Sequence, residues 1–168
     1  MQAKEIKIVF TGSFGSGKVQ AITQLSEVLV TTTKTMSYGE LSLDENKKLN
    51  LYSTIGEKRF DSIICPVLCR GALGLIILID NSQVNPLQEL EYYLDINIDF
   101  VVKMPTIIGI THCDIASEPN LNNYQDFLNN KKLSLSLLKV DLRRRMDVLL
   151  LLEALVLEIE KKHITLTL

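Results

Sequence analysis

The sequence predicts an α/β domain whose sheet is mostly parallel and covered by helices on both faces. Three observations predict it. Apolar runs alternate with helical patterns along the chain, a glycine-rich turn separates the first run from the first helical segment, and a hydrophobic content of 46% is enough to fill a core. A length of 168 residues is typical of one domain, so we expect a single domain over residues 1–168.

Each expected element follows from its local pattern. Strands are expected where apolar residues are continuous or alternate with polar ones, at residues 6–10, 36–43, 49–54, 73–80, 105–111 and 135–140. Helices are expected at residues 19–28, 86–94, 121–130 and 146–162, with a short one inside 55–70, where Pro66 limits its regularity. Residues 44–47 make a hairpin turn between the second and third strands. The result is a six-stranded sheet, parallel except for that hairpin.

The turn after the first strand has the composition of a phosphate-binding loop. Residues 11–18 read TGSFGSGK and contain the complete pattern G-x-x-x-x-G-K. Glycines let successive N–H groups turn inward around an anion, the helix N-terminus adds its positive dipole end, and Lys18 adds a full charge. The alternative is a glycine-rich turn that binds nothing. The residues expected to contact phosphate are Gly12, Ser13, Phe14, Gly15, Ser16, Gly17, Lys18 and Val19.

Further polar residues follow other expected strands. Ser53 and Thr54 end one strand, residues 111–114 follow another, and Asp141 follows the last. In open α/β sheets, ligands bind at the carboxyl ends of the strands. We therefore expect these segments and the glycine-rich loop to form one site.

Composition limits the classes of partner. A net charge of −2 argues against nucleic acid, and the one basic cluster, residues 143–145, is typical of a solvated turn or helix start. We expect no membrane span, no terminal prenylation site and no signal peptide. Three cysteines without a secretion signal favour a reducing, cytoplasmic setting, with Cys65 and Cys69 as buried thiols rather than zinc ligands.

Six segments of the chain carry a family resemblance: the loop at 12–18 with its phenylalanine, the strand MSYGEL at 36–41, GEKRF at 56–60, RGALG at 70–74, THCD at 111–114 and VDLR at 140–143. In these segments the chain resembles a Ras-like small GTPase of the P-loop NTPase fold, and most of all the bacterial MglA-type branch. The resemblance covers nearly the whole chain. It implies GTP or GDP as the ligand and a protein partner, which in that branch is commonly a roadblock-fold protein.

The resemblance also implies roles for the base-reading residues. Thr111, His112 and Asp114 stand at the guanine-reading motif, where a carboxylate accepts two N–H bonds that adenine cannot supply. The alternative for Asp114 is a cap on the next helix. His112 replaces the family's lysine, and it either stacks on the purine or is an ordinary turn residue. Leu142 is expected to offer its backbone N–H to the guanine oxygen.

Three departures from the family pattern affect hydrolysis. Val19 removes the hydroxyl that ligates Mg²⁺, Ser53 replaces a metal-associated aspartate, and Glu57 stands at the water-positioning site. An ionised glutamate cannot donate a hydrogen bond there. We therefore assign no catalytic residue and no metal ligand, leave Mg²⁺ binding open, and expect GTP hydrolysis to be very slow or absent.

The function expected from the sequence is a guanine-nucleotide-binding switch or scaffold that acts through a protein partner. The alternatives are a pseudo-GTPase adaptor that binds no nucleotide and an ATP-dependent enzyme on a related fold, against which Asp114 argues. The apolar segment 148–157 leaves a homodimer open, and the apolar segment 63–68 is a candidate partner face if exposed. The four threonines at 31–35 include no clear switch residue.

Overall fold

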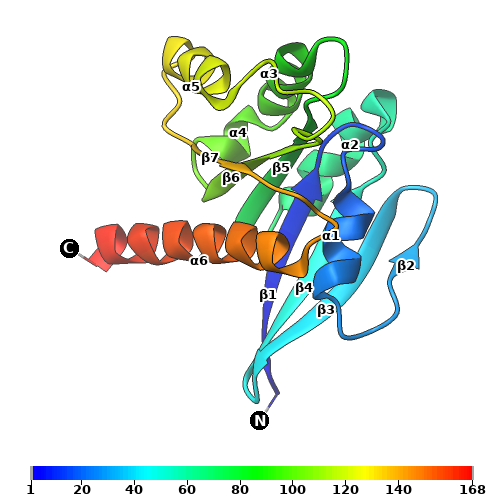
Figure 1. Cartoon of the computed structure of the whole chain (residues 1–168). Coiled ribbons are helices and arrows are strands. Elements are labelled where there is room, and N and C mark those ends of the chain that lie inside the picture. Colours follow the sequence, from blue (N-terminus) through cyan, green and yellow to red (C-terminus); the bar gives the residue numbers. More distant parts are fainter. Residues whose placement is uncertain (1, 168) are drawn as a thin grey trace.

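The protein folds into three layers, with one sheet between two layers of helices (Figure 1). The structure is a computed structural model that describes the backbone of residues 2–167 and the side chains of residues 2–163. The strands of this region are β1 (Lys4–Thr11), β2 (Thr31–Thr32), β3 (Met36–Asp44), β4 (Lys47–Thr54), β5 (Gly74–Asp80), β6 (Thr106–Thr111) and β7 (Ser136–Lys139). The helices are α1 (Lys18–Leu25), α2 (Lys58–Cys69), α3 (Pro86–Ile96), α4 (Ile98–Val101), α5 (Leu121–Asn130) and α6 (Arg145–Thr167).

The sheet is mostly parallel, as the sequence predicts. Its order is β2-β3-β4-β1-β5-β6-β7. The β2–β3 and β3–β4 pairs are antiparallel, and the other four pairs are parallel. The expected six strands are all present, but the described sheet has seven. The seventh, β2, consists of two threonines paired with Ser37 and Tyr38. Two residues carry no periodic pattern, which is why the sequence predicts only a crossing there; the one-turn α4 is missed for the same reason.

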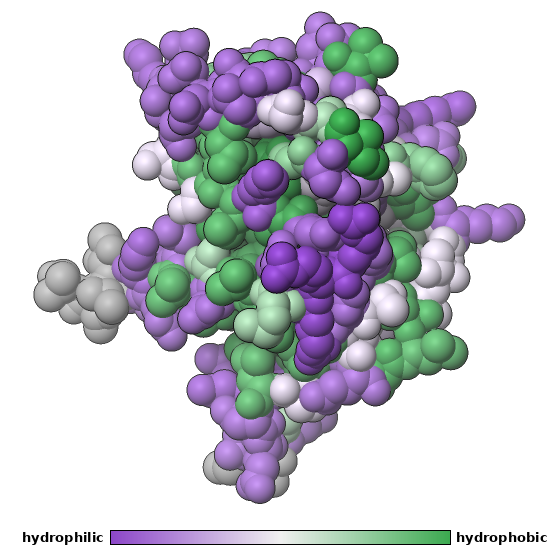
Figure 2. All heavy atoms as spheres, in the orientation of Figure 1, coloured by the Kyte–Doolittle hydropathy of each residue, from purple (hydrophilic) through white to green (hydrophobic). Residues whose placement is uncertain are grey.

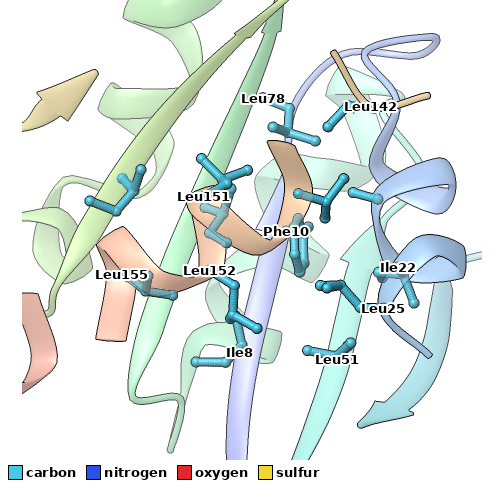
Figure 3. Close-up of a cluster of buried hydrophobic side chains, with 14 of the residues drawn as sticks. Ile8, Phe10, Ile22, Leu25, Leu51, Leu78, Leu142, Leu151, Leu152 and Leu155 are labelled. Atoms are coloured by element: carbon cyan, nitrogen blue, oxygen red, sulfur yellow. The ribbon is translucent and has the colours of Figure 1, made fainter. Parts of the chain in front are cut away.

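One face of the sheet is covered by α1 and α6. Successive side chains of a strand point to opposite faces, so Ile8 and Phe10 of β1 both face these helices. They pack against Ile22 and Leu25 of α1, with the α6 leucines close by (Figure 3). This packing fixes the position of α1 on the parallel strands β4, β1, β5 and β6. This packing positions the loop that joins β1 to α1.

The other face of the sheet is covered by α2, α3 and α5. Its cluster includes Tyr93 and Tyr124, which are fully buried, and the thiols of Cys65 and Cys69. Both thiols are buried and free, so the expectation of buried thiols is confirmed.

Two helices also carry exposed apolar residues. On α6, Val148, Leu151 and Leu155 are buried, whereas Met146, Leu150 and Leu157 are at least half exposed. On α2, Ile63 is 64% and Val67 52% exposed, on the side opposite Cys65. Among the described residues, no helix has the length and apolar content that crossing a membrane requires.

Candidate functional site

The loop between β1 and α1 has the backbone of an anion-binding turn. Gly12, Gly15 and Gly17 all have positive φ, at 144°, 78° and 99°. At Gly12 a Cβ would lie 2.1 Å from the carbonyl oxygen of Leu78, and at Gly17 it would lie 2.3 Å from Leu142 Cδ1. Gly12 accepts no Cβ without a backbone shift, because the close atom belongs to the backbone of β5, and Gly17 requires at least that the Leu142 side chain move. At both positions the positive φ also favours glycine. The loop geometry is therefore set by the sequence.

Lys18 is buried inside this loop. Its side chain is 5% exposed, and Nζ donates to the carbonyl oxygens of Gly12 and Ser13, both at 2.7 Å. Burial lowers the pKa of Lys18 to about 8, although the charge of Asp61 acts in the opposite direction. The ammonium is thus held at the loop with little water around it. An anion placed here would favour its charged form.

The segment before α2 rests on the loop. The Phe14 N–H donates to the carbonyl oxygen of Gly56 at 3.0 Å, and the Gly56 N–H donates to Asp61 Oδ1 at 3.3 Å. Phe14 itself is 84% exposed. Within the described residues, the backbone N–H groups of Gly15 and Gly17 have no hydrogen-bond partner.

A buried hydroxyl in the loop supports the same interpretation. Ser13 Oγ is buried and has no partner within the described residues. A phosphate would supply acceptors for this hydroxyl and for the amides of Gly15 and Gly17. The residues present therefore fit a phosphate group.

Two cavities flank the start of α1. One, of about 280 Å³, is lined by the loop, by Thr32 and Ser37 beside it, and by Thr54 at the end of β4. The other, also of about 280 Å³, is lined by residues that follow β6 and β7. Gln20 of α1 lines both cavities, so they adjoin. Each is large enough for part of a small ligand, one beside the loop and one beside the strand ends.

The second cavity contains the expected base-reading residues. Thr111, His112, Asp114 and Leu142 all line it or lie at its base, as the sequence predicts. Leu142 is 4% exposed, and its side chain points into the core beside Leu78 (Figure 3). Its side chain anchors the segment, so that its backbone stays at the cavity.

Arg143 crosses this cavity as an ion-pair clamp. Its guanidinium donates to Asp114 Oδ2 at 3.0 Å and to both carboxylate oxygens of Asp141 at 2.8 Å. The hydrogen bond from Arg143 holds the pKa of Asp141 at about 2. Figure 2 shows strongly hydrophilic residues gathered over the start of α6 and the neighbouring α1. The basic cluster is solvated, as expected, but Arg143 is also part of the site.

Thr111 and His112 tie the second cavity to neighbouring parts of the chain. Thr111 Oγ1 lies 3.2 Å from the carbonyl oxygen of Ser16, which ties the loop to β6. His112 has a positive φ of 57°, and its Nδ1 lies 3.0 Å from Asp80 Oδ1. Burial raises the pKa of Asp80, but hydrogen bonds from Ser82 and Gln83 outweigh it and leave the pKa below its ordinary value. The imidazole is therefore held at the cavity wall by a carboxylate.

Asn81 fixes the segment that follows β6. Its side chain is 1% exposed, donates to the carbonyl oxygens of Ala116 and Pro119, and accepts from Tyr124 OH at 2.6 Å. Three groups, two from the segment after β6 and one from α5, thus meet at one amide. The arrangement stabilises the backbone on which Asp114 is presented.

The residues at the expected magnesium position do not supply its usual ligands. Val19 is 43% exposed where a hydroxyl would be needed, and the Ser53 side chain is fully buried without a partner in the part of the chain described. Within that part, no group of three His, Cys, Asp or Glu side chains could hold a metal ion. Glu57 is the residue before α2, and its side chain is exposed. These residues do not fit a magnesium site.

Sequence reasoning missed four residues of the site: Gln20, Gly56 as a loop contact, Asp61 and Arg143. One signal was available for Asp61. It lies four residues before Cys65 and seven before Leu68, so it is a lone carboxylate on the buried face of α2. Gln20 carried no signal, because any residue after Val19 would line both cavities. Of the threonines at 31–35, only Thr32 lines the cavity by the loop, and Thr33 Oγ1 caps the turn to Met36.

Comparison with known proteins does not assign the chain to a family. No protein-family model matches the chain, and no curated protein matches it significantly. The fold and the site together define an α/β domain with a glycine-rich loop and an adjoining, acid-lined cavity at one edge of a parallel sheet.

Proposed function

We propose that this protein is a Ras-like P-loop domain that binds a guanine nucleotide and acts through a protein partner as a regulatory switch or scaffold. One observation carries the proposal. The loop cavity and the cavity of Asp114 adjoin at Gln20, so a phosphate chain and a base of one nucleotide would reach both. The MglA-type resemblance is the reason to expect a guanine nucleotide, GTP or GDP, and a roadblock-fold partner.

The phosphate end would hold a diphosphate with main-chain groups and one ammonium. The N–H groups of Gly15 and Gly17, the Ser13 hydroxyl and the start of α1 would supply donors, and Lys18 would supply charge. A phosphate oxygen would replace the carbonyl oxygens that Lys18 now contacts. These groups bind and orient; they do not activate water.

At the base end, Asp114 would accept N–H bonds from the guanine edge, and the Leu142 N–H would bind the guanine oxygen. Asp114 must first release Arg143, which can stay on Asp141. His112, held by Asp80, would lie against the purine. An adenine would leave the Asp114 carboxylate unpaired, so guanine is preferred over adenine.

Hydrolysis of GTP would be impaired. Val19 has no hydroxyl and the Ser53 side chain is buried, so neither would ligate a metal at the loop, and an ionised Glu57 would not donate a hydrogen bond to a phosphate oxygen. GTPases depend on a bound metal and an oriented water for their rate. The protein would therefore bind nucleotide without turning it over at an ordinary rate.

The partner would dock on exposed apolar residues near the loop. Phe60, Ile63 and Val67 are exposed on one side of α2, at spacings of three and four residues, and Phe14 is exposed on the loop. Because Phe14 and Gly56 are hydrogen-bonded, nucleotide binding and this surface are physically connected. The exposed stripe of α6, Met146, Leu150 and Leu157, is the face that would serve a homodimer.

The test is to denature the purified protein by heat, identify any released nucleotide, and then titrate GDP, GTP and ATP into nucleotide-free protein. We expect GDP or GTP to bind and ATP to compete poorly. Lys18→Ala should weaken binding about tenfold to 100-fold, the value of a charge-assisted hydrogen bond. Lys47→Ala removes an exposed lysine on the distant β3–β4 hairpin and should leave affinity unchanged. Absence of released nucleotide, together with no thermal shift on adding GDP or GTP, would refute the proposal.

A pseudo-GTPase adaptor that binds no nucleotide is the second candidate function. It is favoured by the partners that the site groups already have: the Phe14 N–H on Gly56, Lys18 on two carbonyl oxygens, and Asp114 on Arg143. In that case the loop is a structural element and only the apolar surface acts. Capture of a roadblock-fold partner by wild type and Lys18→Ala with equal affinity, in the absence of any nucleotide, would support this candidate over the first.

A further inference from the structure

Asp61 is a buried carboxylate that the binding scheme above does not use. Its side chain is fully buried in the first turn of α2, where Tyr93 OH donates to Oδ2 at 2.8 Å and the Gly56 N–H donates to Oδ1 at 3.3 Å. Burial raises the pKa of Asp61 above its ordinary value, although the Tyr93 hydrogen bond and the charge of Lys18 oppose this. A buried carboxylate is costly, so its placement here asks for an explanation.

Gly56 lies between Asp61 and the loop. Its carbonyl oxygen accepts the Phe14 N–H at 3.0 Å, and a Cβ on Gly56 would lie 2.7 Å from Lys18 Nζ. Gly56 therefore lies against the loop and the Lys18 ammonium, and its N–H is a backbone donor of the segment next to them. Asp61 already occupies that donor.

The charges around this point favour a short phosphate chain. Lys18 is the cation that faces the loop from inside, and its charge interacts with Asp61. The exposed Glu57 adds a second carboxylate at the start of α2. A third phosphate would meet a carboxylate where it needs a donor, and like charges a few ångströms apart repel strongly at low dielectric.

We propose that Asp61 makes this site selective for nucleoside diphosphates over triphosphates, by placing a negative charge at the Gly56 N–H, beside the loop. The inference rests on the proposed nucleotide binding and specifies its ligand. The protein would then act as a diphosphate-bound scaffold rather than as a switch driven by hydrolysis.

The test measures the dissociation constants of GDP and GTP, each in EDTA and in Mg²⁺, for wild type, Asp61→Asn and Asp126→Asn. Asparagine keeps the shape of Asp61 and an acceptor for Gly56. Asp126→Asn makes the same change in net charge on the exposed outer side of α5. We expect wild type to bind GDP at least about tenfold more tightly than GTP, and Asp61→Asn to narrow that ratio by about tenfold through tighter GTP binding. Asp126→Asn should keep the wild-type ratio.

Wild-type protein alone provides a second measurement in case Asp61→Asn fails to fold. Pyrophosphate should displace bound GDP at a lower concentration than tripolyphosphate does. Equal affinity of wild type for GDP and GTP, or an unchanged ratio in folded Asp61→Asn, would overturn the selectivity and leave nucleotide binding intact. No binding of either nucleotide to any variant would overturn both.

Discussion

The two ends of the candidate site hold their charged groups in opposite ways. At the phosphate end, Lys18 is 5% exposed and rests on two main-chain carbonyl oxygens. At the base end, the side chains of Arg143 and Asp114 are 65% and 55% exposed, and they pair with each other in water. An exposed ion pair is worth about 0–1 kcal/mol, whereas a buried charge without a partner costs several.

The difference teaches how each end would open. At the base end, Asp114 can separate from Arg143 at a small cost in free energy. Arg143 keeps its ion pair with Asp141, and water replaces Asp114 as its other partner. The phosphate end opens only for a ligand that brings acceptors of matching charge to Lys18. Selectivity for phosphate therefore comes from the buried, packed Lys18, whereas selectivity for the base comes from exposed side chains that can move.

The largest effect is expected from a change that breaks the phosphate end. Gly12→Ala forces a Cβ against the Leu78 carbonyl oxygen, 2.1 Å away, and should lower the free energy of unfolding by about 3–5 kcal/mol. Gly15→Ala is the matched control, because its φ is also positive but no atom lies within 4 Å of the new Cβ. It should cost only about 1 kcal/mol. Urea denaturation measures both, and equal losses would show that the loop is not held by the sheet.

Burial of the Lys18 ammonium should appear in the pH dependence of stability. Its pKa of about 8 lies below the ordinary 10.5, so between these values the unfolded chain binds the additional proton. The free energy of unfolding of wild type, relative to Lys18→Met, should rise with pH across that window by about 3 kcal/mol. Denaturation of both proteins at pH 7, 8, 9 and 10 tests this. A difference that stays flat would place Lys18 in water.

A moderate effect is expected at Asn81, which supports the base end from below. Asn81→Ala leaves two carbonyl oxygens and Tyr124 OH without their partner and should destabilise the protein by about 2 kcal/mol. Because the segment carrying Asp114 loses its anchor, GDP affinity should fall more than pyrophosphate affinity does. Calorimetric titration with each ligand separates the two. A parallel fall for both would mean that Asn81 acts only on overall stability.

The smallest effect is expected at Arg143. Arg143→Gln removes exposed ion pairs, so the free energy of unfolding should change by less than about 1 kcal/mol. GDP should bind up to about fivefold more tightly, because Asp114 no longer has to release a cation. Arg144→Gln, which removes the same charge from a neighbouring residue that makes no ion pair with Asp114, is the control. Weaker GDP binding in Arg143→Gln would mean that the guanidinium contacts the base instead of competing with it.

The sequence predicted the parts of the molecule that depend on local pattern. Residues 11–18 form the loop, α5 begins and ends where expected, and Thr111, His112, Asp114 and Leu142 converge on one cavity. The contacts that close the site were not predictable in this way. Gly56 meets Phe14, and Arg143 meets Asp114, across 42 and 29 positions of sequence, and no periodicity encodes such pairs. Lys18 was recognised by its motif, but its burial against carbonyl oxygens follows only from the packing of α2 on the loop.

The central claim is that main-chain amides and one ammonium hold a diphosphate here without a metal. Calorimetric titration of GDP into nucleotide-free protein, first in EDTA and then in excess Mg²⁺, tests it most directly. The account predicts saturable one-to-one binding whose dissociation constant agrees within about threefold between the two conditions, since Val19 has no hydroxyl and the Ser53 hydroxyl is buried, so neither offers the usual ligand for a nucleotide-bound Mg²⁺. Binding that appears only with Mg²⁺, or no binding in either condition, would contradict it.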